Sequence, residues 1–118
     1  MHRFSSTYYD IALMKLERNV TVLDTVAPTC LWLDDEIRFP ELLAAGWGRT
    51  GFEYISGSVS KRCYKAGSPI VWRKALNDTG YVEYLVHLYS YGSCKSNIPR
   101  VVARVAAYIE WFKEVLQY

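Results

Sequence analysis

The sequence predicts a mostly β fold that ends in a single helix. Ten tyrosines and four tryptophans among 118 residues favour strands and aromatic packing over a helical bundle. From Val105 onward, apolar residues recur at positions 105, 109, 112 and 116, while Glu110, Lys113 and Glu114 fall on the opposite face. This spacing predicts an amphipathic C-terminal helix.

The clearest strand signal is a hairpin. Residues 70–72 and 81–91 have strand-like composition and flank Asn77-Asp78-Thr79-Gly80, a sequence typical of a tight turn. Three earlier segments are also predicted as strands: 9–16, 19–26 and 42–47. The segment 57–67 is rich in Gly, Ser and Lys and is predicted to be irregular.

Composition limits the classes of function. A chain that is 51% hydrophobic and 22% charged, with a net charge of +2, is typical of one small globular domain. The basic excess is too small to indicate binding to nucleic acid or to a charged membrane surface. No signal peptide follows Met1, no apolar run is long enough for a membrane span, and no motif indicates a cofactor.

The cysteines leave two interpretations open. Cys30, Cys63 and Cys94 lack metal-ligand spacing, so no metal site is expected. In an oxidising compartment the odd count predicts one disulfide and one remaining thiol; the alternative is a cytosolic protein with three ordinary thiols. The sequons at Asn19 and Asn77 are candidate N-glycosylation sites and are compatible with secretion.

Four blocks in order resemble the trypsin-like serine protease family, most closely its insect clip-domain branch. The blocks are Asp10–Leu16; Val26–Trp32 with Ala45–Thr50; Cys63–Val71; and Tyr89–Gly92 with 94–111. The resemblance implies that residues 1–118 form a partial peptidase domain lacking most of the N-terminal barrel and part of the C-terminal barrel. The fold class implied is all-β, an incomplete antiparallel β-barrel with a C-terminal α-helix packed across it.

Of the catalytic triad, the resemblance supplies one member. Asp10 matches the aspartate that orients the catalytic histidine. The chain contains only His2 and His87, and neither lies in a sequence like the family's Ala-Ala-His-Cys. His87, inside Val86-His87-Leu88, is interpreted as a histidine of the barrel wall.

The nucleophile loop departs from the family pattern of Gly-Asp-Ser-Gly-Gly-Pro. This chain reads Lys65-Ala66-Gly67-Ser68-Pro69, with one residue fewer. Alignment on Pro69 places Ala66 at the nucleophile and Lys65 at the aspartate that, in the family, pairs with the new amino terminus after activation cleavage. Ser68 falls two residues out of register, so we expect it not to replace the nucleophile.

The specificity pocket also departs from the family. Lys61 stands where trypsin-like members carry an aspartate, and Arg100 stands where a pocket-lining glycine is usual. Ser90-Tyr91-Gly92 resembles the edge strand that pairs with substrate backbone, which allows peptide binding by strand addition. The alternative interpretation is that these three residues simply form a barrel strand.

The resemblance assigns the cysteines as well. Cys63 and Cys94 match the pair that joins the walls of the substrate pocket. Closing a loop of about 32 residues contributes roughly 3–4 kcal/mol in the chain-entropy model. Cys30 matches the cysteine that pairs with an upstream segment, which this chain lacks, so we expect it to be unpaired.

These features predict a catalytically inactive serine protease homologue, an extracellular binding or regulatory protein of a proteolytic cascade such as those of insect innate immunity. Its expected partners are other proteases or cascade proteins, with neither nucleic acid nor membrane. The extracellular location is inferred from the family alone. The alternative is a truncated fragment of a serine-type endopeptidase gene without independent function.

Overall fold

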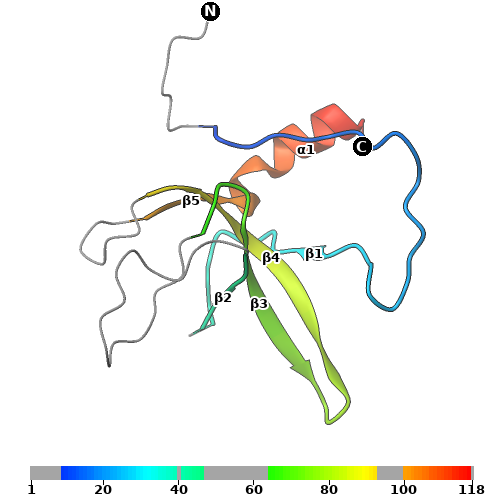
Figure 1. Cartoon of the computed structure of the whole chain (residues 1–118). Coiled ribbons are helices and arrows are strands. Elements are labelled where there is room, and N and C mark those ends of the chain that lie inside the picture. The colour runs from blue at the N-terminus through cyan, green and yellow to red at the C-terminus, as the bar shows by residue number, and fades with distance from the viewer. Residues whose placement is uncertain (1–8, 40, 47–63, 93–99, 118) are drawn as a thin grey trace, which may run out of the picture.

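The predicted hairpin is the centre of the structure. The computed structural model describes residues 9–39, 41–46, 64–92 and 100–117. Strand β3 (Pro69–Leu76) pairs antiparallel with β4 (Gly80–Tyr91), and the two project together from the rest of the chain (Figure 1). In the connecting turn, the Thr79 amide donates to the Leu76 carbonyl at 3.4 Å. The hairpin prediction is therefore confirmed.

Three short strands extend this hairpin into a five-stranded sheet. β2 (Leu43–Ala44) pairs antiparallel with β3, while β1 (Cys30–Leu31) and β5 (Val101–Arg104) both pair with β4. β1 and β5 share one edge of β4, because Tyr84 and Leu85 opposite β1, and His87 and Leu88 opposite β5, also pair with β3 on the other side. The β1–β4 pair is parallel and the others are antiparallel.

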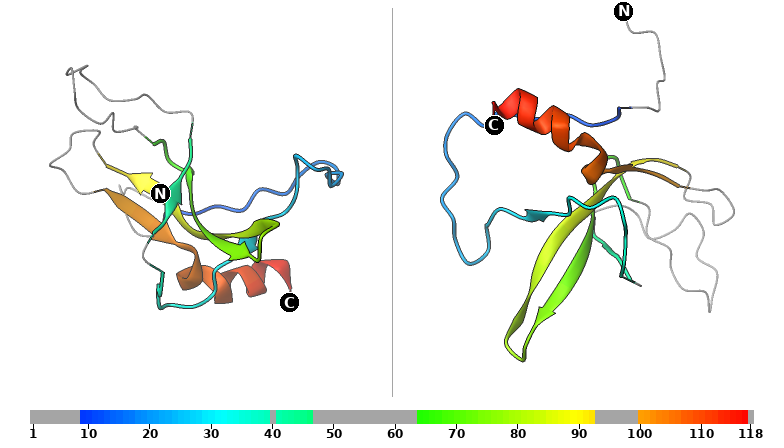
Figure 2. Two further views of the ribbon diagram at one scale, coloured as in Figure 1. Left: turned by 90° about the horizontal axis from the view of Figure 1, so that it is seen from below. Right: turned by 180° about the vertical axis from the view of Figure 1, so that it is seen from behind.

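The sheet remains open. Within the described ranges β2 stands at one end of the sheet order and β1 at the other, and these two strands do not pair, so no barrel closes (Figure 2). The all-β class and the incompleteness of the barrel are confirmed.

Strand β4 contains two interruptions of its register. Ile70 pairs with His87 and Val71 with Leu85, so the ladder to β3 passes over Val86. The ladder to β5 likewise passes from Tyr89 to Tyr91 and leaves Ser90 unpaired. Each interruption is a β-bulge, which bends the strand and redirects a side chain.

The C-terminal segment forms a helix in two parts. A 3-10 turn, η1 (Val105–Tyr108), leads into α1 (Ile109–Leu116), which confirms the prediction from apolar spacing. The left-handed residue Gln117 (φ 60°) ends α1, and its amide bonds the Glu114 carbonyl. Neither helix of the described chain is long and apolar enough to span a membrane.

The core is small and lies where β4, β5 and η1 meet. Its buried apolar residues in the described part are Val86, Tyr89, Ala103 and Val105. Large hydrophobic residues of the described strands are nevertheless exposed, namely Leu31, Leu43, Leu76, Tyr81 and Tyr91. The sheet therefore leaves much of its apolar surface exposed to solvent.

Two of the predicted strands are wrong. Residues 9–16 form no strand, and residues 19–26 contain only an isolated bridge between Leu23 and Val26. Leu13 and Val22 are exposed, because no described strand lies beside either segment to receive it. The strand predicted at 42–47 is reduced to β2, and Trp47 lies outside the described residues.

A cluster of four aromatic rings covers one face of the hairpin. Phe39 stacks on Trp72 at 4.5 Å between centroids, and Trp72 stacks on Tyr84 at 5.6 Å. Trp32 meets all three of these rings edge-on. Such pairs stabilise beyond the area they bury, so the cluster acts as a second, smaller core.

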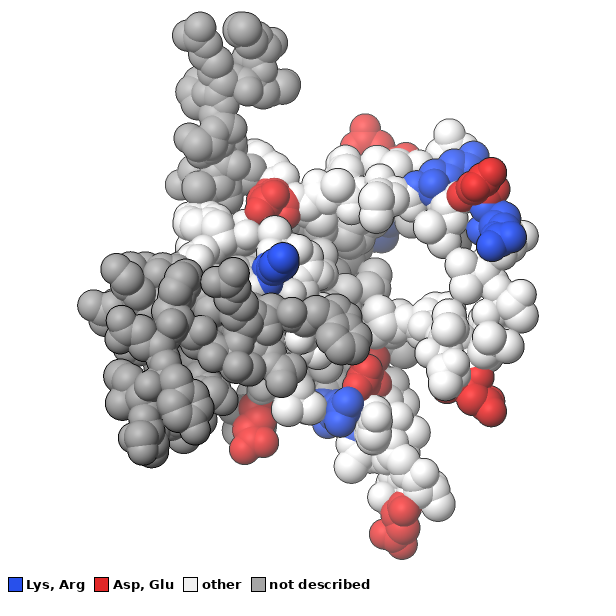
Figure 3. Space-filling model, in the orientation of Figure 1, with Lys and Arg blue, Asp and Glu red and all other residues white. Residues whose placement is uncertain are grey.

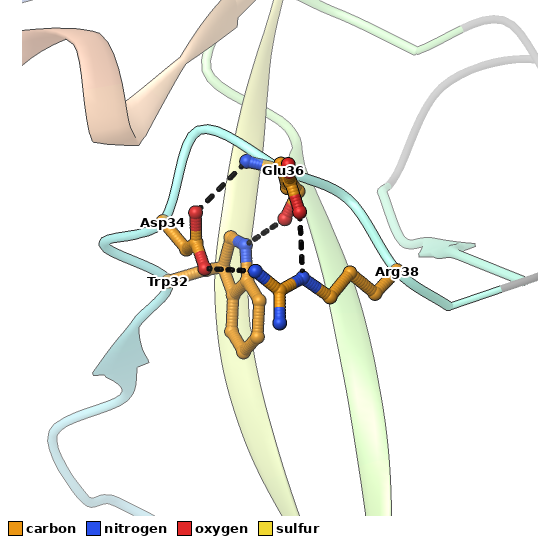
Figure 4. A network of polar contacts seen from close by, with 4 residues as sticks. All are labelled: Trp32, Asp34, Glu36 and Arg38. Carbon is orange, nitrogen blue, oxygen red and sulfur yellow. Dashed lines mark hydrogen bonds and ion pairs between the residues drawn. The ribbon is translucent and has the colours of Figure 1, made fainter.

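Polar contacts fold the chain after Trp32 back over this cluster (Figure 4). The Trp32 indole N–H donates to the Glu36 carbonyl at 3.1 Å, and the Glu36 amide donates to Asp34 Oδ1 at 3.0 Å. The Arg38 guanidinium lies 2.8 Å from Glu36 and 3.6 Å from Asp34. These contacts bring Phe39 back to the ring of Trp72.

Candidate active-site region

The Asp10 carboxylate is held by the Ser90 hydroxyl. Ser90 Oγ donates a hydrogen bond to Asp10 Oδ2 across 80 residues of sequence. Ser90 is buried, whereas Asp10 is exposed. The contact attaches the otherwise unpaired segment 9–16 to the sheet.

The bulge in β4 accounts for this contact. Ser90 is the residue that the β4–β5 ladder passes over, so it is the unpaired residue of the bulge. A bulged residue is free of the regular alternation and can aim its side chain away from the ladder. The local irregularity thus presents the Ser90 hydroxyl to Asp10.

The Lys65–Ser68 loop is anchored at the neighbouring residue, Tyr89. The Gly67 amide donates to the Tyr89 carbonyl at 2.8 Å, and the Tyr89 amide donates to the Ser68 carbonyl at 2.9 Å. The Ser68 amide donates to the Lys65 carbonyl at 3.0 Å and closes a tight turn. Gly67 takes a φ of 86° at the third position of that turn, a conformation that favours glycine. Ala66 is therefore an exposed residue at the tip of the turn.

Asp10 and the Lys65–Ser68 turn are consequently brought together by adjacent residues of β4. Tyr89 holds the turn through its backbone, and Ser90 holds Asp10 through its side chain. The Ser68 hydroxyl points elsewhere: it lies 3.0 Å from where a side chain on Gly46 would begin. Within the described chain it makes no hydrogen bond to Asp10.

A hollow of about 430 Å³ opens beside Asp10. Its walls come from the segment before Ile11, the end of β4, strand β5 and the 3-10 turn η1. The lining residues are Tyr9, Asp10, Ser90, Tyr91, Val101, Val102, Ala103, Arg104, Ala107 and Tyr108. The sequence did not predict the contribution of Ala107 and Tyr108, because helical periodicity alone does not show which sheet edge a helix will meet.

The residues after Ser90 meet Arg100 closely. Tyr91 pairs with Val101, and both Tyr91 and Gly92 are exposed. A side-chain carbon on Gly92 would come within 2.8 Å of the Tyr89 hydroxyl and 3.0 Å of Arg100 Cα, so only glycine fits there. The side chain of Arg100 runs along the same position, with Cγ at 3.1 Å. The expectation that Arg100 fills the specificity pocket remains a prediction, since Lys61, the other residue that departs from the family pattern there, lies outside the described residues.

His87 belongs to the wall of the sheet. It lies in β4 between Ile70 of β3 and Arg104 of β5, and it is half-buried. Burial lowers its pKa below the usual value of 6.5, and the positive charge of Arg104 lowers it further. The imidazole is therefore neutral at pH 7. No described contact joins it to Asp10.

The remaining predicted sites divide between described and undescribed residues. Cys63 and Cys94 lie outside the described residues, so their pairing stays a prediction. The Cys30 thiol is exposed on β1, and Asn19 and Asn77 are both exposed. Among the described residues, no three His, Cys, Asp or Glu side chains are grouped as a metal site would require. On the face shown in Figure 3, described acidic and basic residues are interspersed.

Two comparisons with known proteins found a match. The family model described as Trypsin matches residues 2–66, which include Asp10 and the start of the Lys65–Ser68 turn. Serine protease snk of Drosophila melanogaster is 51% identical over 51 residues, which are 43% of this chain and 12% of the fly protein. No solved structure matches. Because the family model covers more than half of the chain, this protein belongs to the trypsin family of serine proteases.

Proposed function

We propose that this chain is a catalytically inactive serine protease homologue that acts by binding in an extracellular proteolytic cascade. The observation that supports the proposal is the Lys65–Ser68 turn, which is anchored on Tyr89 and which we align with the family's nucleophile loop. Ala66 occupies that position and has no hydroxyl to attack a peptide carbonyl.

The second support is the position of His87, the one histidine among the described residues. Serine attack requires a histidine between the nucleophile and the aspartate. His87 is fixed in β4 beside Arg104, with a lowered pKa, and its partners are backbone neighbours in the ladder. Asp10, in turn, receives its hydrogen bond from Ser90. No contact among the described residues joins either side chain to the turn.

A surface suited to binding remains at the end of β4. Tyr91 is 44% exposed, and Gly92 beside it is also exposed. An extended peptide could add along this stretch by main-chain hydrogen bonds, with the Tyr91 ring as an apolar contact. The partners we propose are proteases or other proteins of the same cascade, and the clip-domain affiliation is part of this proposal.

Two measurements on the full chain test the proposal. A fluorophosphonate probe and a broad peptide ester substrate should give no labelling and no hydrolysis above buffer, for both the natural chain and its Ser68→Ala variant. Labelling of Ser68 would overturn the claim of inactivity. For binding, the chain should retain an immobilised, active-site-blocked trypsin-like protease, and Tyr91→Ala should weaken that affinity several-fold while Tyr81→Ala, at the hairpin tip, should not. Equal affinities would contradict the proposed surface.

The alternative is that the chain is a truncated fragment of a serine-type endopeptidase gene and has no independent function. The observation that favours it is the apolar surface that the described strands leave exposed, including Leu31, Leu43 and Leu76. Thermal unfolding separates the two. A cooperative transition supports the binding protein, whereas a broad, aggregating one supports the fragment.

A further inference from the structure

The tip of the β3–β4 hairpin carries a motif that the protease-like features do not use. Asn77-Asp78-Thr79 is an N-glycosylation sequon, and it forms the turn between Leu76 and Gly80. All of its residues are exposed. Asn77 has a φ of 46°, a left-handed conformation that turns the chain here. We infer that Asn77 carries an N-linked glycan, which covers the projecting end of the hairpin.

The side chains of the sequon are available to the modifying enzyme. In the described part of the chain, neither the side-chain amide of Asn77 nor the hydroxyl of Thr79 makes a hydrogen bond. The turn is closed by backbone groups, because the backbone N–H of Thr79 donates to the Leu76 carbonyl at 3.4 Å. A glycan needs an asparagine that projects into solvent on a surface loop. Asn77 has that position in the hairpin turn, and attachment of a glycan would break no described hydrogen bond of its side chain.

The hairpin end has edges that need covering. On its outer side, β3 pairs with β2 at Ile70 and Val71 only. On the opposite side, β4 pairs with β1 at Tyr84 and Leu85 and with β5 beyond them. Within the described chain, residues 73–76 and 80–83 thus pair with each other alone. Open edges of this kind are templates for aggregation, and a bulky hydrophilic glycan at their end would block the approach of another strand.

The same geometry keeps the glycan away from the candidate active-site region. From Gly80 to Ser90, β4 advances roughly 30 Å at about 3.3 Å per residue. A sugar chain on Asn77 therefore leaves Asp10 and the Lys65–Ser68 turn accessible. The other sequon, at Asn19, lies in an exposed segment without a sheet edge beside it, so it serves as a matched control.

The inference rests on the extracellular location in the proposed function, and its test does not depend on protease binding. The full chain is expressed behind a secretion leader in insect cells, and translocation is verified by protection from added protease. Digestion with peptide-N-glycosidase in heavy-oxygen water marks each glycosylated asparagine as labelled aspartate, and a parallel digest without the enzyme controls for spontaneous deamidation.

We expect the label at Asn77 in the natural chain and in Thr79→Ser, and no label there in Thr79→Ala. A translocated chain with unmodified Asn77 overturns the inference. For the covering role, Asn77→Gln should lower the soluble secreted yield several-fold relative to Asn19→Gln. Equal yields would refute that role even where the glycan is present.

Discussion

The Ser90 hydroxyl donates a hydrogen bond to the Asp10 carboxylate, and this contact ties a segment without strand partners to the longest strand of the sheet. The family aspartate with which we align Asp10 orients a histidine. Here the contact has a structural consequence of its own, because it positions the wall of the hollow that Tyr9 and Asp10 share with β5.

This contact should be measurable as a coupling energy. Ser90→Ala and Asp10→Ala, alone and combined, form a double-mutant cycle, and we expect an interaction of about 1–2 kcal/mol for a hydrogen bond to a partly exposed carboxylate. Urea unfolding followed by circular dichroism supplies the free energies. Additive effects of the two substitutions would show that the contact contributes nothing to stability.

Restoring the nucleophile should not restore activity. In the double variant Lys65→Asp/Ala66→Ser, the family residues return to the turn, but the half-buried His87 still lies in the sheet wall beside Arg104. We expect no ester hydrolysis and no fluorophosphonate labelling, with trypsin as the positive control. Labelling at position 66 would mean that a base is within reach of the turn.

His87 should make the protein less stable in mild acid. Its pKa is lowered in the folded state by burial and by Arg104, so the unfolded chain binds the proton more tightly. The contribution of neutral His87 to the free energy of unfolding is fully present above pH 6.5, the pKa in the unfolded chain. It is lost as the pH falls from that value toward the lower pKa of His87 in the folded state. The loss of unfolding free energy between pH 7 and pH 5 should be smaller in His87→Gln than in the natural chain. An unchanged pH profile would contradict the shift.

The aromatic cluster should carry a substantial share of stability. Trp72 lies between Phe39 and Tyr84, with centroids 4.5 and 5.6 Å away, and it is half-buried. Trp72→Ala should cost about 2 kcal/mol, below the full cost of a buried tryptophan, while Trp72→Phe keeps the stack and should cost less than half as much. Urea midpoints and the near-ultraviolet circular dichroism of the cluster provide the measurement.

The cysteines should separate by reactivity. Cys30 is exposed, so iodoacetamide should modify it under native, non-reducing conditions. Peptide mapping of the same sample should recover Cys63 joined to Cys94. Recovery of Cys30 in a mixed disulfide with either of them would contradict the assignment.

The sequence was sufficient where structure is determined locally. The turn at Asn77–Gly80 and the spacing from Val105 predicted the hairpin and the helix, because both depend on neighbours in the chain. The sequence failed at residues 9–16 and 19–26, since an apolar run becomes a strand only where another strand lies beside it.

The sequence predicted which residues belong to the candidate site, but not how the fold brings them together. The family resemblance selected Asp10, Ser90 and the Lys65–Ser68 turn, and it gave no sign that Tyr89 and Ser90 anchor them side by side. The parallel pairing of Cys30 with Tyr84 depends on the path of a long connection, which local pattern does not encode. The aromatic cluster could have been suspected from Trp32 and Trp72, although nothing in their spacing indicates stacking.

The two bulges of β4 have a consequence for insertions and deletions. Side chains alternate along a strand, so loss of one residue turns everything beyond it to the other face. Loss of a bulge residue is the exception: without Val86, Leu85 would still oppose Val71 and His87 would still oppose Ile70, so the residues beyond keep their faces and only the buried Val86 side chain is lost. Deletion of the regularly paired Leu88 would instead turn Ser90 away from Asp10, so the effect of a deletion in β4 depends on whether the lost residue belongs to a bulge.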